Sequence, residues 1–292
     1  MKDNQQLWRW TSLAPLLLFF GALALLPVAN ILYMSFHTVQ WAEGVSTWTP
    51  VGLENYERLP KDAFFSIGVW NTIVFSVTSV AIQMVLGFLL ALAVVRIKWG
   101  STFYKTIFIL PILIPGIVIG AIWKLMLDFD FGVLNQINIW LGLQPLDWTG
   151  SVKLAMPAII IVDVWHWTPF VFLLMLAGLQ GLPEDVFEAA KVDGTGPFRE
   201  LFKITLPLML PTILVTLMFR IILAFKVFDE IFLLTGGGPG TATEVIAFSI
   251  FRTFFFENRV GLGSAMSFAV IFAVALLVVI SLAAQRYAQS KG

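Results

Sequence analysis

The sequence predicts an all-α integral membrane protein with six transmembrane helices. Hydrophobic residues make up 59% of the 292-residue chain and charged residues only 12%, about half the charged fraction of a soluble domain. A helix needs about 20 apolar residues to cross the bilayer core, where it satisfies its own backbone hydrogen bonds. The stretches that are long and apolar enough are residues 12–36, 68–95, 103–127, 156–180, 204–226 and 263–285.

The first of these stretches is expected to remain in the protein as a helix. The apolar run Leu13–Phe36 is longer than the apolar region of a signal peptide, and it lacks a small-residue cleavage pattern. Four tryptophans, Trp8, Trp10, Trp70 and Trp99, lie at the ends of predicted spans. Because an indole prefers the membrane interface, these positions support the expected span boundaries.

Lysine and arginine residues predict the orientation, because they are enriched on the cytoplasmic side of a membrane. With the N-terminus inside, the inner segments hold ten of them and the longer outer segments five. The inner ones are Lys2, Arg9, Arg96, Lys98, Lys105, Lys191, Arg199, Lys203, Arg286 and Lys291, and the outer ones are Arg58, Lys61, Lys153, Arg252 and Arg259. We therefore expect residues 1–11 and 286–292 in the cytoplasm, flanking one transmembrane domain at 12–285.

Composition also excludes several kinds of chemistry. The chain has no cysteine and two histidines, which excludes disulfides and thiolate sites and argues against a histidine metal cluster. Its net charge is zero and it has no basic run, which argues against a nucleic acid partner. It has neither a nucleophile–base pattern nor a glycine-rich phosphate loop. We therefore predict that the chain is not an enzyme and binds no cofactor.

One cytoplasmic segment, residues 181–203, is more elaborately patterned than a simple connector requires. Pro183 suits the first position of a helix, Gly194 suits a helix terminator, and Pro197 opens a second helix through Lys203. We therefore expect two short helices that meet at a glycine-rich corner. The acidic side chains of this segment are Glu184, Asp185, Glu188, Asp193 and Glu200.

Two interpretations of this segment follow from its residues alone. Ala189, Ala190 and the glycine corner permit the close approach of another protein. Alternatively, the first helix is amphipathic and lies on the membrane surface. Anionic phospholipid would repel the acidic side chains, which weakens the second interpretation without removing it.

The same segment resembles the EAA motif of binding-protein-dependent ABC permeases. Glu188-Ala189-Ala190 is followed after three residues by Gly194 and then by Ile204-x-Leu206-Pro207. The resemblance covers about residues 13–285 and implies the type I ABC importer (MetI-like) permease fold. It also implies that the segment forms a coupling helix, which docks on a cytoplasmic ATPase subunit. The implied coupling residues are Glu188, Ala189, Ala190, Asp193, Gly194 and Pro207.

A second resemblance narrows the group. Residues 234–239, Leu-Thr-Gly-Gly-Gly-Pro, are similar to a segment of carbohydrate permeases related to the maltose and glycerol-3-phosphate systems, although an interhelical turn explains them equally well. Further matches are Asn71-Thr72, Leu110-Pro111 and Trp165-x-x-x-Pro169. The implied activity is the import of a sugar, oligosaccharide or polyol by alternating access. A non-carbohydrate solute is the alternative cargo.

The resemblance implies a set of partners in the bacterial cytoplasmic (inner) membrane. They are a second homologous permease, two ATPase subunits that carry the ATP and Mg, and a periplasmic or extracellular substrate-binding protein. The predicted outer segments 37–67 and 240–262 are candidate docking surfaces for the binding protein. An ion-driven secondary transporter is the main rival; it would predict buried acids on several spans and an inverted repeat, and the sequence offers no clear sign of either.

The fourth and fifth spans supply the candidate substrate pathway. Aromatic faces beside hydrogen-bonding groups suit a sugar, whose ring has apolar C–H faces and a rim of hydroxyls. In the maltose permease the fourth span contributes to the substrate site, and Trp165 and Pro169 align this chain with it. The candidate pathway residues are Asp163, His166, Trp167 and Phe170 on the fourth span and Arg220, Ala224 and Phe228 on or just after the fifth.

Structural roles are open for the same side chains. The two tryptophans of the fourth span can instead belong to an interfacial belt, and His166 can hydrogen-bond a neighbouring helix. Asp163 can form an ion pair with Arg220 or Lys226. Gln83 is expected to link helices rather than bind a ligand. A further alternative gives Arg220 the recognition of an acidic sugar.

Overall fold

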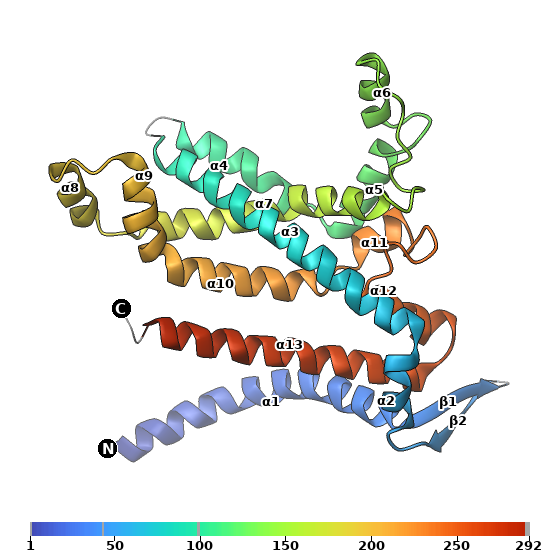
Figure 1. Ribbon diagram of the computed structural model, residues 1–292. Coiled ribbons are helices and arrows are strands. Elements are labelled where there is room, and N and C mark those ends of the chain that lie inside the picture. Colours follow the sequence, from blue (N-terminus) through green and yellow to red (C-terminus); the bar gives the residue numbers. More distant parts are fainter. Residues whose placement is uncertain (1, 43, 98–99, 290–292) are drawn as a thin grey trace. The chain divides into compact units, whose positions relative to one another are not determined.

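The computed structural model describes residues 2–42, 44–97 and 100–289 and divides the chain into two compact units (Figure 1). Unit 1 comprises Met1–Ser66 and Ser249–Ala273, and unit 2 comprises Ile67–Phe248 and Val274–Gly292. Among the described residues, five helices are long and apolar enough to cross a membrane, and a bent pair of helices makes a sixth such stretch. Lys98, Trp99 and Lys291, on which sequence predictions depend, lie outside the described residues.

Five predicted spans are confirmed as continuous helices. Each is free of acidic and basic residues over most of its length, and in lipid a helix satisfies all the backbone hydrogen bonds of such a segment internally. The long helices are α1 (Lys2–Ser35), α3 (Ala63–Val95), α7 (Ala155–Gln180), α10 (Leu206–Ala224) and α13 (Val260–Gln289).

The prediction of one continuous helix at 103–127 is wrong. This stretch consists of α4 (Ser101–Ile109), the 3₁₀ turn η2 (Leu110–Leu113) and α5 (Gly116–Met126), and the two helical parts are bent by 94°. Pro111 and Pro115 cause the break, because neither can donate a backbone hydrogen bond and each ring clashes with the preceding turn.

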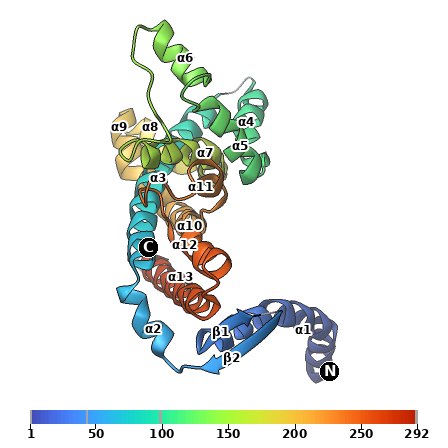
Figure 2. The same cartoon turned by 90° about the vertical axis from the view of Figure 1, so that its right-hand side faces the viewer.

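Unit 1 contains a β-hairpin in the predicted outer segment 37–67, where the all-α prediction placed no strand. Strand β1 (His37–Ala42) pairs antiparallel with β2 (Val45–Pro50), from His37 opposite Pro50 to Ala42 opposite Val45. Figure 2 shows the hairpin directly after α1. The β-branched and aromatic residues of the second strand, Val-Ser-Thr-Trp-Thr, favour a strand, which is the signal that was available in the sequence.

Short helices surround the small core of unit 1. They are α2 (Glu54–Arg58), the 3₁₀ turn η1 (Leu59–Lys61), the C-terminal end of α12 (Ile246–Phe251) and the π-turn η4 (Arg252–Phe256). Leu59, Leu262, Ala265 and Met266 form the buried cluster. Asn55 donates hydrogen bonds to the carbonyl oxygens of residues 35 and 37, which ties α2 to the start of the hairpin.

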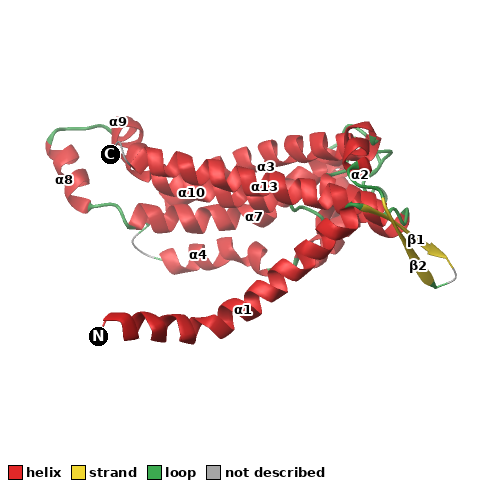
Figure 3. Ribbon diagram, turned by 90° about the horizontal axis from the view of Figure 1, so that it is seen from below, coloured by secondary structure: helices red, strands yellow, loops and turns green. Residues whose placement is uncertain are grey.

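Unit 2 is built around α7. In the most apolar 18-residue stretch of α7, 61% of the residues are buried, whereas none is buried in the corresponding stretch of α1. Figures 1 and 3 show α7 running alongside α10. Glycines permit this close packing: a Cβ atom added at Gly87 of α3 would lie 2.6 Å from Val171 Cγ1, and one at Gly178 would lie 2.7 Å from Thr212 Cγ2.

The remaining helices of unit 2 are short. They are α6 (Val133–Trp140), α8 (Glu184–Val192), α9 (Pro197–Glu200) and α11 (Asp229–Leu234). Helix α11 packs against α5 because Gly116 and Gly120 present no side chains there; a Cβ atom at Gly120 would lie 2.9 Å from the Cβ of Leu233.

Candidate functional site

Helix α8 forms the first half of the predicted cytoplasmic corner and ends in a Schellman motif. Gly194 has a φ of +67°, which a glycine adopts without the strain that a Cβ atom causes. Its N–H donates to the Lys191 carbonyl oxygen (3.1 Å), and the Thr195 N–H donates to the Ala190 carbonyl oxygen (2.9 Å). This is the pair of bonds that stops a helix at a left-handed residue, so the predicted role of Gly194 as a helix terminator is confirmed.

The candidate coupling residues are accessible around this corner. Glu188, Ala189, Asp193 and Gly194 are exposed, while Ala190 faces the protein and is buried. A Cβ atom at Gly194 would have no atom within 4 Å, so the corner itself is open. Pro207 lies apart from these residues, exposed in the first turn of α10.

The second half of the corner differs from the prediction. Gly196 precedes α9 and Pro197 occupies its first turn, as expected. However, α9 does not end at Lys203 as a separate helix: it continues through the π-turn η3 (Leu201–Thr205) directly into α10. Helical backbone is therefore continuous from Pro197 into α10.

Three buried side chains from three helices form a polar triad inside unit 2. Gln83 of α3 donates through Nε2 to Asp163 Oδ2 of α7 (2.8 Å) and to the Asp163 carbonyl oxygen (2.9 Å). Arg220 of α10 donates through Nη2 to Asp163 Oδ2 (3.1 Å) and through Nε to Gln83 Oε1 (2.7 Å). The structural interpretations of Gln83 and of an Asp163–Arg220 ion pair are thus confirmed.

The guanidinium of Arg220 also lies over an aromatic ring. Its Cζ is 5.0 Å from the centroid of the Trp167 ring, a cation–π distance. The Nη1 atom is buried and has no hydrogen-bond partner among the described residues. Arg220 is fully buried, which disfavours the alternative that it binds an acidic sugar directly.

His166 forms the second polar link, to a residue that sequence reasoning missed. Its Nδ1 lies 3.0 Å from Glu230 Oε1 of α11, and both side chains are buried. The interpretation of His166 as a bond between helices is therefore confirmed. Two consecutive acids, Asp229 and Glu230, directly after an apolar span were the available signal, because a buried carboxylate requires a partner.

A cavity of about 230 Å³ opens beside these groups. Four of the predicted pathway residues line it: Asp163, His166, Trp167 and Phe228. The remaining lining residues are Gly116, Leu223, Lys226, Val227, Asp229 and Glu230. The other predicted residues do not line the cavity: Arg220 and Ala224 are buried, and the centroid of the Phe170 ring lies 6.2 Å from that of the Trp167 ring. The cavity is smaller than the ~300–1,000 Å³ typical of a small-molecule site.

The glycine run after α11 is held by the pair Asn71-Thr72. Gly236 and Gly237 have φ values of +57° and +84°, which end the helix as predicted. Asn71 Nδ2 donates to the carbonyl oxygens of residues 241 (3.0 Å) and 244 (2.9 Å), and Thr72 Oγ1 accepts from the N–H of residue 246 (2.9 Å). Two motifs that lie far apart in the sequence thus form one structural feature.

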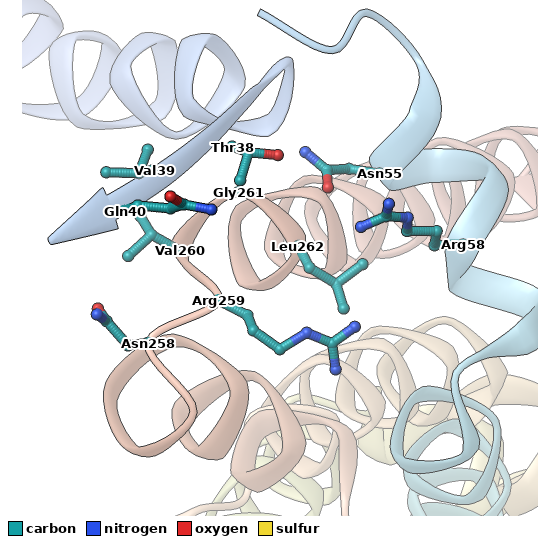
Figure 4. A pocket seen from close by; sticks show the side chains of 10 residues that line it. All are labelled: Thr38, Val39, Gln40, Asn55, Arg58, Asn258, Arg259, Val260, Gly261 and Leu262. Carbon is teal, nitrogen blue, oxygen red and sulfur yellow. The ribbon is translucent and has the colours of Figure 1, made fainter. Parts of the chain in front are cut away.

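In unit 1, the two segments predicted to be docking surfaces lie side by side around a pocket of about 210 Å³. Figure 4 shows residues of β1 and α2 on one side and residues 258–262 on the other. Two cations, Arg58 and Arg259, line it. Arg58 pairs with Glu54, and Arg259 pairs with Asp62 at 3.4 Å. The full lining is Thr38, Val39, Gln40, Asn55, Arg58, Asn258, Arg259, Val260, Gly261 and Leu262.

Comparison with known families identifies the chain. Residues 83–291, which include the triad, α8 and α10, match the family of binding-protein-dependent transport system inner membrane components. The chain belongs to this family. It is a permease, and the prediction that it is a transport subunit and not an enzyme is confirmed.

Relatives of the permease are similar over almost their whole length. The trehalose/maltose transport system permease protein MalF of Thermococcus litoralis is 38% identical over 87% of this chain and 85% of that protein. The sulfoquinovosyl glycerol transport system permease protein SmoG of Agrobacterium fabrum is 33% identical over 94% of this chain and 93% of that protein.

The fold of the permease also matches a solved structure. A chain of a bacterial ABC transporter involved in the import of the acidic polysaccharide alginate superimposes with a TM-score of 0.82 and 25% identity, over 99% of this chain and 98% of that chain. The predicted type I ABC importer (MetI-like) permease fold is therefore confirmed.

Proposed function

We propose that this permease forms the membrane channel of an ATP-driven importer for a sugar, oligosaccharide or polyol. Partner subunits supply the energy through the α8 corner, and the cargo passes by alternating access. The observation that carries the proposal is the α8 corner itself: an exposed, capped helix with small residues, joined through α9 and η3 to the membrane helix α10.

The coupling role is supported by what α8 offers a soluble partner. The small side chain of Ala189 allows a groove on a partner protein to approach the helix closely, and the exposed Glu188 beside it supplies a negative charge. The two Schellman hydrogen bonds keep the C-terminal end of α8 from unwinding, so a partner that displaces α8 would move the corner as a unit. Because α9 is continuous with α10, and Arg220 of α10 belongs to the triad, this movement would reach the buried polar groups.

A carbohydrate cargo is supported by the relatives and by the cavity. The two relatives named above transport trehalose or maltose and sulfoquinovosyl glycerol, according to their names. The cavity combines the rings of Trp167 and Phe228 with the polar groups of His166 and Lys226, which suits C–H faces and hydroxyls. Because it is small, we propose that a second permease completes the site at their shared interface.

The proposed assembly contains a second permease, two ATPase subunits that bind ATP and Mg, and a substrate-binding protein. With both termini in the cytoplasm of a bacterial inner membrane, the residues that line the unit 1 pocket belong to the predicted outer segments 37–67 and 240–262. We propose this pocket and its two arginines as part of the docking surface for the binding protein.

A matched pair of glycine variants tests the coupling role. Gly194→Asp places a bulky acid at the open corner, whereas Gly196→Asp places the same acid two residues away, where φ is −73° and a Cβ atom would also meet nothing within 4 Å. An aspartate adopts the left-handed conformation more readily than most residues, so Gly194→Asp should still fold. We expect it to abolish ATP-driven uptake by the reconstituted complex, while Gly196→Asp retains most of it.

Two further measurements separate the possible failures. Thermal unfolding should show that Gly194→Asp is folded, and affinity purification in mild detergent should recover a second permease and a Walker-motif ATPase with the unaltered chain. Normal uptake by a folded Gly194→Asp variant would exclude a coupling role for this corner. Recovery of the chain alone would contradict the proposed assembly.

A further inference from the structure

Helix α6 carries an exposed apolar face on the side of unit 2 away from α8. Val133, Ile137 and Trp140 are spaced i, i+4 and i+7, so they lie on one side of the helix, with Leu141 next to them. All four are exposed, Trp140 by 84%. A continuous apolar face of this kind is a mark of an interaction site. We refer to these four residues as the α6 face.

The opposite side of α6 is fastened to its own loop by Asn135, which is fully buried. Its side-chain oxygen accepts from the Leu146 N–H (2.9 Å) and from Trp148 Nε1 (3.1 Å). Its amide nitrogen donates to the carbonyl oxygens of Phe129 (3.1 Å) and Leu146 (2.9 Å). The loop thus satisfies several of its own polar groups, and the α6 face is held in a fixed direction.

The segment around α6 has no charge to offer a soluble partner. Residues 131–146 contain no acidic or basic side chain, and Asp130 and Asp147 mark the ends of this run. A protein docking site normally surrounds its apolar centre with a polar, solvent-accessible rim. A membrane interface makes no such demand, and it favours an exposed tryptophan like Trp140.

The position of α6 points to the same surroundings. In the chain it lies between α5, the second half of the bent stretch, and the membrane helix α7. Figures 1 and 2 show it level with the start of α7 and displaced to the side of that helix, rather than extended beyond it along the helix axis. A segment placed level with the end of a transmembrane helix and to its side lies at the depth of the lipid headgroups.

We propose that α6 is an interfacial anchor: its apolar face lies in the bilayer surface at the end of α7 opposite to α8. The partner of the α6 face is therefore lipid and not a protein. This inference depends only on α7 crossing the membrane, and it holds whichever cargo the permease carries.

Two isoleucines provide a matched test. Ile137 and Ile139 are both exposed, by 47% and 52%, but they lie about 200° apart around the helix. The chain contains no cysteine, so Ile137→Cys and Ile139→Cys each introduce a single thiol for a nitroxide spin label. The full chain would be reconstituted in nanodiscs of phosphatidylcholine and phosphatidylglycerol.

Collisions with oxygen, which partitions into lipid, are then compared with collisions with a nickel chelate, which stays in water. We expect an oxygen-to-nickel ratio several-fold higher at Ile137 than at Ile139. Equal nickel accessibility at the two positions would place the α6 face in water and overturn the proposal. Low accessibility of Ile137 to both reagents would show that a protein covers the face, and would overturn it equally.

Discussion

Helices α6 and α8 lie at the two ends of α7, have similar lengths, and offer their surroundings opposite chemistry. Four of the nine residues of α8 are charged, and none of the eight residues of α6 is. Helix α8 exposes small side chains beside acids, whereas α6 exposes Ile137 and Trp140. The 26 residues of α7 give it a length of about 39 Å, enough to separate the two across a bilayer.

A short exposed helix of a membrane protein is therefore better interpreted by its charges than by its apolar content. Acids beside alanines suit a soluble partner that approaches closely, and anionic lipid repels them. An uncharged helix with a tryptophan suits the headgroup region. Each helix is also made rigid by a local device, the Gly194 cap in α8 and the Asn135 bonds beside α6, so each presents a defined face.

Both short helices flank α7, so the triad that links α7 to α3 and α10 gives the largest expected effect. Arg220→Met leaves the carboxylate of Asp163 buried without its cation, and breaking such a pair typically costs about 3–5 kcal/mol. We expect a large fall in thermal stability, with faster hydrogen exchange at both ends of α7. An effect confined to α6 or to α8 would show that α7 does not link them.

The double variant Arg220→Met/Asp163→Asn is the control for this prediction. It removes both charges together, and replacing a whole buried pair is often neutral. Its unfolding temperature should therefore lie well above that of the single variant. Equal unfolding temperatures would mean that Arg220 contributes through packing against Trp167 and not through the charge of Asp163.

The packing of α7 against α3 gives the next largest effect. Gly87→Val would bring a side chain within 2.6 Å of Val171 Cγ1 and 2.9 Å of the Phe172 backbone nitrogen. Overpacking of this kind costs about 1–3 kcal/mol. Gly21→Val is the matched control, because a Cβ atom at Gly21 of α1 would have nothing within 4 Å. The two unfolding temperatures should differ clearly, and a similar loss in both would indicate an effect of helix propensity alone.

The smallest effect is expected at α6, and it sharpens the contrast with α8. Asn135→Ala removes the hydrogen bonds that fasten the loop, which should cost about 1–2 kcal/mol of local stability. Hydrogen exchange should quicken over residues 127–154 and remain unchanged over α8. Exchange that quickened equally in both regions would contradict two independently ordered helices.

Much of the fold was predictable because lipid is a demanding solvent. Long apolar runs located the five continuous helices: the runs at 12–36, 68–95 and 263–285 are free of charge, and those at 156–180 and 204–226 hold one and two charged residues. The glycines at 194 and 236–237 located helix ends. Two features were not predicted. The break at Pro111–Pro115 was missed because prolines are tolerated in membrane helices. The hairpin at 37–50 was missed because its short run of alternating residues is only a weak indication of a strand.

The number of apolar stretches, the helix ends at glycine and the EAA corner could be predicted from local sequence, since each depends on neighbouring residues. Which buried groups meet depends instead on how the helices pack. Gln83, Asp163 and Arg220 are as much as 137 positions apart, and nothing in local sequence indicates that three helices cross where their polar side chains lie. Likewise, Glu230 became the partner of His166, and Asn71 the support of the glycine run, because packing brought them within hydrogen-bond distance. A buried polar group without a hydrogen bond costs free energy, so each of these groups bonds to the partner that packing places beside it.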